Sequence, residues 1–331
     1  GNTSSSKMVK PLMPLYTGQF RCILIDFLGN GRSDRVECFS SDIWYEEGLQ
    51  AIALAEHLPY GKTFLVGTSG GAWAAIHAAL ERPDLFRAVI ADSFDGRTLH
   101  DHFADHLQAE RSAAKADPQS RAFYAWCQGP DWETIVDLDT AALLQLAEEK
   151  RYLFHKPLAQ IRIPLLLMGS RRDEMCRKNL EEEYQQMAAH IPRATIQMFE
   201  HGGHPAILTN AEQAAATTPE NWIDMKNRID EKAACNQLPC VCIGEAHIPR
   251  SLFSVRAAGV CPGTPSGKVY MVSKTSSNGW SLNRQLYFAG SQPEDGTPHR
   301  LLQQAMPCEK TSEGCDSCEN CISPWPGANL P

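Results

Sequence analysis

Short apolar runs alternate with amphipathic segments along the N-terminal part of the chain. The apolar runs are rich in Leu, Ile, Val and Phe, which is typical of strands that are buried on both faces. They cover residues 20–27, 63–68, 86–93, 163–170 and 194–200. The segments between them have helical patterns at residues 43–58, 70–82 and 178–190. This alternation predicts an α/β fold with a mostly parallel sheet flanked by helices.

Residues 97–161 interrupt the alternation of strands and helices. This stretch is rich in His, Trp and Ala and has no strand pattern, so we expect a helical cap over one edge of the sheet. Its notable side chains are His100, His102, His106, Trp126 and Trp132. The spacing of His102 and His106 permits a metal site, but no third ligand is near, and a polar or pocket-lining role is favoured. The two tryptophans either line a substrate pocket or pack the cap.

A change in composition divides the chain at about residue 233. Of the 12 cysteines and 21 prolines, eight cysteines and ten prolines lie in residues 233–331. Residues 267–275 and 284–290 are candidate strands around a turn-like Ser-Ser-Asn-Gly segment, but the fold of this extension is left unassigned. We therefore predict an α/β domain at residues 1–213, a closing helix or linker at 214–232, and a Cys- and Pro-rich extension after it.

The last cysteines of the extension leave several roles open. Cys308, Cys315, Cys318 and Cys321 have spacings that suit a zinc ion or an iron–sulfur cluster, although they form no clear paired knuckle. Disulfides are a second option, which a reducing compartment disfavours, and cysteines without a specific role are a third. We assign no metal and no cofactor to the chain.

Charge and hydropathy narrow the range of partners. The 331 residues carry a formal net charge of -8, and no long basic run is present to neutralise a nucleic-acid backbone, so we expect no nucleic-acid partner. No apolar stretch approaches the roughly 18 residues of a membrane-spanning helix, and the first residues lack the order of a signal peptide. These observations predict a cytoplasmic protein with no membrane partner. Because the chain begins with Gly rather than Met, we expect a processed, trimmed or partial N-terminus.

The segment Gly67-Thr68-Ser69-Gly70-Gly71 matches the pattern G-x-S-x-G. Its context makes it informative, because a predicted strand precedes it and a predicted helix follows it. In such a sharp turn the serine is exposed at the carboxyl edge of the sheet, and its neighbours must be small. The backbone N–H of Gly70, at the start of the helix, favours a developing oxyanion. We predict that Ser69 is a nucleophile; a purely structural turn is the alternative.

A serine nucleophile needs a base, and the base needs a carboxylate that orients it. Asp173 and His204 each follow a predicted strand, so we expect both at the same edge of the sheet as Ser69. The order Ser, Asp, His along the chain is the order that this architecture uses. Glu174 competes with Asp173 for the acid, and His201 competes with His204 for the base. The glycines before His204 favour it, because they allow a tight loop.

Together these motifs resemble the α/β-hydrolase superfamily. The elbow VGTSGG, the segment LIDFLGNGRSD, the strand and loop IPLLLMGSRRDE and the loop GGHPAILTN carry the resemblance, in particular to small bacterial hydrolases of the enol-lactonase and meta-cleavage-product hydrolase group. It extends from Gly1 to about Gln213. The resemblance implies a loop whose backbone N–H binds the oxyanion. By position Asn2 would supply this second donor, next to Gly70; a disordered polar terminus is the alternative.

The resemblance also implies strands that we do not find in the sequence. Family members have three strands before the loop that contains Asn2, and the third lies between the strands predicted here at 20–27 and 63–68. Without it, two rows of backbone groups would lack partners, at a cost of roughly 1–3 kcal/mol for each buried group. We expect either that the sequence is a fragment or that the extension or another chain fills the gap.

The predicted function is that of a serine hydrolase. Ser69, His204 and Asp173 would cleave a carboxylic ester or a related acyl bond of a small molecule through an acyl-enzyme, with no cofactor. Hydrolysis of a C–C bond in a diketone uses the same three side chains and is an alternative. A non-catalytic or incomplete protein on a hydrolase scaffold is a further alternative, and the oligomeric state is left open.

Overall fold

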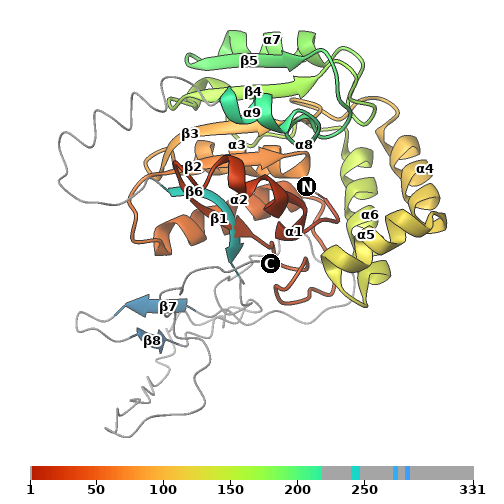
Figure 1. Cartoon of the computed structure of the whole chain (residues 1–331), viewed down its shortest axis with the longest axis horizontal. Helices are drawn as coiled ribbons and strands as arrows, with labels where there is room; N and C mark the ends of the chain where they lie inside the picture. Colours follow the sequence, from red (N-terminus) through yellow and green to blue (C-terminus); the bar gives the residue numbers. More distant parts are fainter. Residues whose placement is uncertain (1, 218–239, 247–270, 275–279, 284–331) are drawn as a thin grey trace, which may run out of the picture. The chain divides into compact units, whose positions relative to one another are not determined.

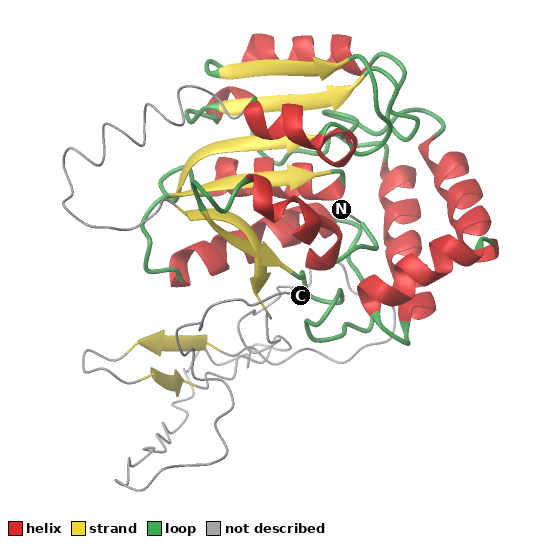
Figure 2. Cartoon of the chain, viewed as in Figure 1, coloured by secondary structure: helices red, strands yellow, loops and turns green. Residues whose placement is uncertain are grey.

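A parallel sheet forms the centre of the molecule (Figure 1, Figure 2). The computed structural model describes residues 2–217, 240–246, 271–274 and 280–283. The strand order is β1 (Arg21–Ile25), β6 (Cys240–Ala246), β2 (Thr63–Thr68), β3 (Phe86–Asp92), β4 (Leu165–Ser170) and β5 (Ala194–Phe199). Every adjacent pair is parallel. The predicted α/β fold is therefore confirmed.

Helices cover both faces of the sheet. One face carries α2 (Ile43–His57), α3 (Gly70–Glu81) and α7 (Leu180–His190). The other face carries η1 (Lys10–Leu15), α8 (Ala206–Thr209) and α9 (Ala211–Ala216). On β4, Leu165 and Leu167 pack with the first group, and Leu166 and Met168 pack with the second. Because both faces are buried, the strand is apolar at successive positions rather than at alternate ones.

Three helices follow β3 and precede β4 along the chain. They are α4 (Phe103–Ala116), α5 (Pro118–Gln128) and α6 (Trp132–Glu149), and the short helix η2 (Leu158–Gln160) follows them. Ala114, Tyr124, Trp132 and Val136 form a small apolar cluster that joins the three helices. In Figure 1 they lie together beyond the ends to which β2 to β5 point. Within the described residues, no helix combines the length and the apolar character needed to cross a bilayer.

The strand between β1 and β2 comes from the C-terminal extension. Along the chain, α1 (Ser6–Val9), η1 and β1 are followed by α2 and β2. β6 comes much later in the sequence but lies between β1 and β2 in the sheet. The register pairs Arg21 of β1 with Cys240, and Phe64 of β2 with Val241. A segment of the extension thus occupies the interior position that the sequence analysis found empty. We did not predict this strand, because its short apolar run lies among cysteines and prolines.

A second, two-stranded sheet is antiparallel and consists of β7 (Met271–Lys274) and β8 (Trp280–Asn283). β7 lies within the strand expected at 267–275. β8 was not predicted, although Trp and Leu alternate in it with Ser and Asn, because the turn-like residues before it hide this period of two. The expected strand at 284–290, the predicted closing helix or linker from residue 218 onward and the last four cysteines lie outside the described residues.

Proline in β6 tests the pairing of this strand. Val241 is in register with Cys22 of β1 and Phe64 of β2, and proline removes a backbone donor from a strand that has neighbours on both sides. We expect Val241→Pro to lower the free energy of unfolding in urea by roughly 1–3 kcal/mol. The matched variant Val241→Thr keeps the N–H and should stay within about 1 kcal/mol of the unchanged chain. Equal stability of Val241→Pro and the unchanged chain would contradict the pairing.

Candidate active site

The turn from β2 to α3 has a strained backbone. Ser69 has φ +55° and ψ -129°, a conformation that costs on the order of 1–3 kcal/mol for a residue with a side chain. The N–H of Ser69 donates to the carbonyl of Asp92 at 2.8 Å, and the N–H of Ala72 donates to the carbonyl of Ser69 at 2.8 Å. A Cβ on Gly67 would overlap the carbonyl of Gly71. The small residues around Ser69 are therefore a steric requirement of this turn.

Ser69 lines a pocket of about 70 Å³. The pocket lies where the end of the sheet meets α4 and α6. Its apolar wall consists of Trp44, Trp73, Phe94, Phe103, Leu107, Leu143 and Met175. Its polar wall consists of Asn2, Ser93, Asp95, Arg111, Cys176 and His204. The structure thus brings the predicted nucleophile, the predicted base and the predicted oxyanion residue Asn2 to one small cavity.

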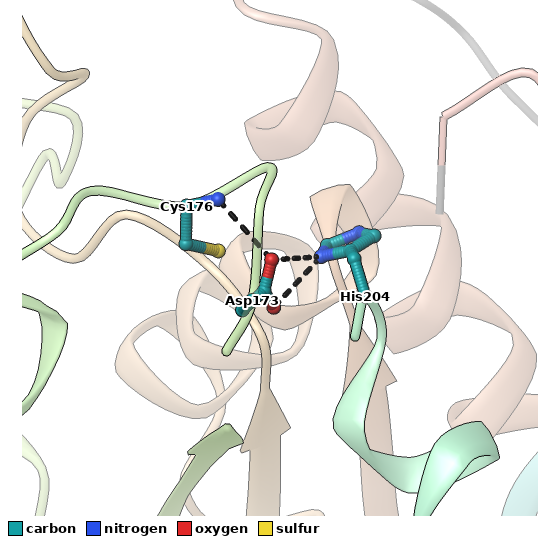
Figure 3. A group of neighbouring side chains, drawn as sticks. All are labelled: Asp173, Cys176 and His204. Atoms are coloured by element: carbon teal, nitrogen blue, oxygen red, sulfur yellow. Dashed lines mark hydrogen bonds and ion pairs between the residues drawn. The ribbon is translucent and has the colours of Figure 1, made fainter. Parts of the chain in front are cut away.

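Asp173 and His204 meet in the loops that follow β4 and β5 (Figure 3). His204 Nδ1 lies 3.0 Å from Asp173 Oδ2 and 3.1 Å from Asp173 Oδ1. The side chain of Asp173 is 1% exposed and that of His204 is 10% exposed. Burial alone would raise the pKa of Asp173, but the hydrogen bond and charge of His204 and the N–H of Met175 hold it below its ordinary value. The ionised carboxylate therefore favours the tautomer with the proton on Nδ1.

The end of β3 supports the loop that carries His204. Asp92 Oδ2 accepts a hydrogen bond from the N–H of Ile207 at 3.2 Å. The same oxygen accepts from Thr68 Oγ1, next to Ser69, at 2.8 Å. One buried carboxyl group thus connects the serine turn to the histidine loop. This connection was not predicted, because Asp92 stands inside an apolar strand pattern with no motif around it.

The competing acid and base take other positions. Glu174 is exposed, and its Oε2 accepts from the backbone N–H of His204 at 3.3 Å rather than from the ring. His201 is exposed, and its carbonyl accepts from Ser170 Oγ at 3.1 Å. The imidazole that lies against Asp173 is therefore that of His204. The catalytic roles of these residues remain predictions.

Asn2 packs against the start of α3, beside Ser69. Trp44 Nε1 donates to Asn2 Oδ1 at 2.9 Å, and Asn2 Nδ2 donates to a carboxylate oxygen of Asp139 at 2.7 Å. A Cβ on Gly70 would overlap Asn2 Oδ1, so this close approach requires glycine. The side chain of Asn2 is thus engaged in packing the site, and the oxyanion role predicted for its backbone N–H remains a prediction.

The two tryptophans considered for the pocket do not line it. Trp126 is 49% exposed, and Trp132 stacks on Tyr124 with ring centroids 5.5 Å apart. Trp44 of α2 and Trp73 of α3 stack at 3.9 Å and form the aromatic wall instead. The pocket-lining interpretation of the cap tryptophans is therefore wrong. The face that a helix turns toward a pocket depends on how the helices pack, which the sequence pattern does not specify.

The histidines before and within α4 do not line the pocket, but His100 contacts Asp95 of its polar wall. His100 Nδ1 lies 2.5 Å from Asp95 Oδ2, and His100 Nε2 lies 3.2 Å from His106 Nδ1. His102 and His106 do not line the pocket around Ser69. The sequence favoured a polar or a pocket-lining role for His102 and His106. His106 takes a polar role through its contact with His100. Neither side chain lines this pocket.

Comparison with known proteins identifies the family. A model described as "Alpha/beta hydrolase family" matches residues 2–217. The chain belongs to the alpha/beta hydrolase family. A curated relative, 2-(acetamidomethylene)succinate hydrolase of Mesorhizobium japonicum, is 36% identical over 94 residues. This match covers 28% of the chain and 33% of the relative, so the chain aligns with about a third of the relative's length.

Solved structures of other proteins share the α/β-hydrolase fold. A serine hydrolase involved in carbazole degradation matches with a TM-score of 0.53 and 18% identity, over 68% of this chain and 88% of that one. A meta-cleavage product hydrolase matches with a TM-score of 0.52 and 17% identity, over 69% and 89% of the two chains. At these identities the likeness concerns the fold alone, and it confirms the fold expected from the resemblance.

The buried carboxyl of Asp92 implies a pH dependence of stability in this α/β-hydrolase. Desolvation raises the pKa of Asp92 to about 7, although hydrogen bonds from Thr68 and Ile207 oppose this rise. An unfolded Asp loses its proton near pH 4. Between about pH 4 and pH 7 the folded state therefore binds a proton that the unfolded state does not, so this group's contribution to stability falls as pH rises.

Asp92→Asn should reduce this dependence. Its amide oxygen can accept from Thr68 and Ile207, and its NH2 group can point to Ser93 Oγ, which lies 3.2 Å from Asp92 Oδ1. We expect the loss of Tm between about pH 5 and about pH 8 to be smaller in the variant, because an amide does not titrate in this range. Thermal unfolding of both proteins at both pH values is the measurement. An identical loss in the two would contradict the assignment.

Proposed function

We propose that this α/β-hydrolase cleaves a carboxylic ester or a related acyl bond by a Ser69–His204–Asp173 mechanism. The observation that carries the proposal is the hydrogen bond of 3.0 Å between His204 Nδ1 and the buried Asp173, in a pocket that Ser69 also lines. A carboxylate that fixes Nδ1–H leaves Nε2 as the base that a serine hydroxyl needs. The strained turn at Ser69 supports the same proposal.

In this mechanism Ser69 Oγ attacks the substrate carbonyl while His204 Nε2 accepts the hydroxyl proton. Asp173 holds the imidazole and stabilises the imidazolium that forms. The backbone N–H groups of Gly70 and Asn2 donate to the oxyanion of the tetrahedral intermediate. His204 then returns the proton to the leaving group, and water, activated by the same imidazole, hydrolyses the acyl-enzyme. No step requires a cofactor.

The pocket favours a small acyl group. Its volume of about 70 Å³ is well below the roughly 300–1,000 Å³ of pockets that hold drug-sized ligands. Stacked Trp44 and Trp73 close one side of the pocket, and Leu107 and Leu143 reach it from α4 and α6. We therefore assign the helices α4 to α6 the role of a cap over the acyl pocket. A short-chain ester is the substrate class that fits this space.

A C–C bond hydrolase is the second candidate. Arg111 lines the pocket, and its buried Nε has no hydrogen-bond partner among the described residues. A substrate oxygen in the pocket would be attracted by the charge of this guanidinium. This favours a substrate with a further carbonyl or carboxylate next to the scissile bond, as in a diketone. The curated relative is itself named for a succinate-derived substrate.

Hydrolysis of a short-chain p-nitrophenyl ester tests the proposal. We expect the unchanged chain to hydrolyse it and Ser69→Ala to lose at least about 1000-fold in kcat, because the nucleophile is removed while the fold is kept. Release of p-nitrophenolate, followed by absorbance, measures both rates. Equal background rates of the two proteins would refute the nucleophile and favour a non-catalytic scaffold.

The two adjacent carboxylates supply a matched control. Asp173→Asn removes the charge that orients His204 and should lower kcat by roughly 1000-fold or more. Glu174→Gln makes the same chemical change one residue further along, and its amide oxygen can still accept from the backbone of His204. We expect Glu174→Gln to stay within about threefold of the unchanged chain. The opposite order of the two variants would reassign the acid.

A further inference from the structure

A thiol stands beside the proposed acid–base pair. A carboxylate oxygen of Asp173, the Sγ of Cys176 and a ring nitrogen of His204 all lie within 4.8 Å of one another. Figure 3 shows the three side chains converging from the loops after β4 and β5. The proposed reaction uses the carboxylate and the imidazole but gives Cys176 no role. Three different metal-binding groups thus lie together where catalysis needs only two.

The loop fixes the position of this thiol. The backbone N–H of Cys176 donates to Asp173 Oδ1 at 3.2 Å, and that of Met175 donates to the same oxygen at 3.0 Å. These bonds form a tight turn in which the carboxylate and the thiol three residues later point to the same side. The backbone of Cys176 is thus held close to Asp173, and its Sγ lies beside the carboxylate.

The donor set suits zinc. Thiolate, imidazole and carboxylate are zinc ligands, whereas Ca²⁺ and Mg²⁺ prefer oxygen atoms alone. A tetrahedral zinc ion needs its ligand atoms roughly 3.3 to 3.8 Å apart, and the three ligand atoms here lie within 4.8 Å of one another. Cys176 and His204 also line the pocket around Ser69. An ion held here would have its fourth position open to the pocket.

We propose that Asp173, Cys176 and His204 form a binding site for zinc, and that zinc bound there switches the hydrolase off. Binding of the ion needs only the three side chains. Inhibition, in contrast, rests on the proposed function, because it assumes that His204 is the base. The two parts of the proposal can therefore be tested separately.

The inhibition follows from the position of the imidazole proton. In the metal-free pair, Nδ1 of His204 faces Asp173 and carries the proton. Zinc that joins Asp173 to this ring must take Nδ1, so the ring keeps its neutral form by carrying its proton on Nε2. The nitrogen that would accept the proton of Ser69 is then already protonated. The imidazole can no longer act as the base.

The protons balance in this step. A cysteine thiol is protonated at neutral pH in the absence of a metal, so the metal-free protein holds an S–H group. Zinc binding breaks the S–H bond, forms a Zn–S bond and releases one proton to solvent. The imidazole exchanges its Nδ1 proton for one on Nε2 without net change. No redox partner is needed.

A basic side chain next to the cluster is already paired with two carboxylates. Arg177, the residue after Cys176, has its Nε 4.0 Å from Asp95 Oδ1, and one of its terminal nitrogens lies 3.6 Å from Glu183 Oε2. Its charge is therefore offset by two carboxylates. Asp173 and a thiolate at Cys176 would together supply the two negative charges that balance Zn²⁺.

Cobalt, which replaces zinc and gives a thiolate-to-metal absorption band, tests the binding. We expect Co²⁺ to produce a larger band in the full chain than in Cys176→Ser. Cysteines elsewhere in the chain contribute equally to both proteins, so the difference reports on Cys176. The matched variant Cys22→Ser changes a partly buried cysteine on β1, outside the site, and should keep the band. Ser69→Ala should also keep it.

Zinc inhibition of ester hydrolysis tests the consequence. Each rate is expressed relative to the metal-free rate of the same protein. We expect half inhibition of Cys176→Ser to need at least about tenfold more zinc than half inhibition of the unchanged chain. Cys22→Ser should behave like the unchanged chain. A chelator should restore the rate. Equal cobalt bands in the chain and in Cys176→Ser would overturn the site. A cobalt difference without ester hydrolysis would keep the site and refute the proposed function.

Discussion

The strained turn at Ser69 is the constraint on which the rest of the site depends. A positive φ at a residue with a side chain is unfavourable, and it persists here because β2, α3 and the end of β3 enclose the turn. The bond from Ser69 N–H to the carbonyl of Asp92 joins the turn to β3. The side chain of Asp92 then bonds the loop that carries His204. Ser69 and His204, the proposed nucleophile and base, are therefore positioned through one strand end.

The sheet is the part of the fold that the sequence predicts best. Strands buried on both faces must be apolar at successive positions, and runs such as 163–170 carry that signal without knowledge of their neighbours. β6 gives no comparable signal, because its place is defined by partners on β1 and β2 that lie about two hundred residues away along the chain. Long-range pairing of this kind cannot be read from a local pattern.

In the candidate site too, the sequence predicts some features and gives no sign of others. The contact between Asp173 and His204 could be predicted, because both residues follow the carboxyl ends of neighbouring strands in the chain order of this architecture. The residues that form the walls of the pocket could not be predicted from the sequence. Trp44 and Trp73 reach it from helices whose patterns give no sign of a cavity, while Trp132 packs among α4, α5 and α6. Cys176 was overlooked because a single cysteine has no spacing motif.

Covalent labelling of Ser69, the proposed nucleophile, tests the central claim most directly. A fluorophosphonate reacts with a serine only when a neighbouring base activates it, so the chain and His204→Gln would be treated in parallel and the modified peptide mapped by mass spectrometry. The account predicts an adduct on Ser69 in the unchanged chain, formed at least about 100-fold more slowly in His204→Gln. An adduct at another residue, no adduct, or equal rates in the two proteins would contradict it.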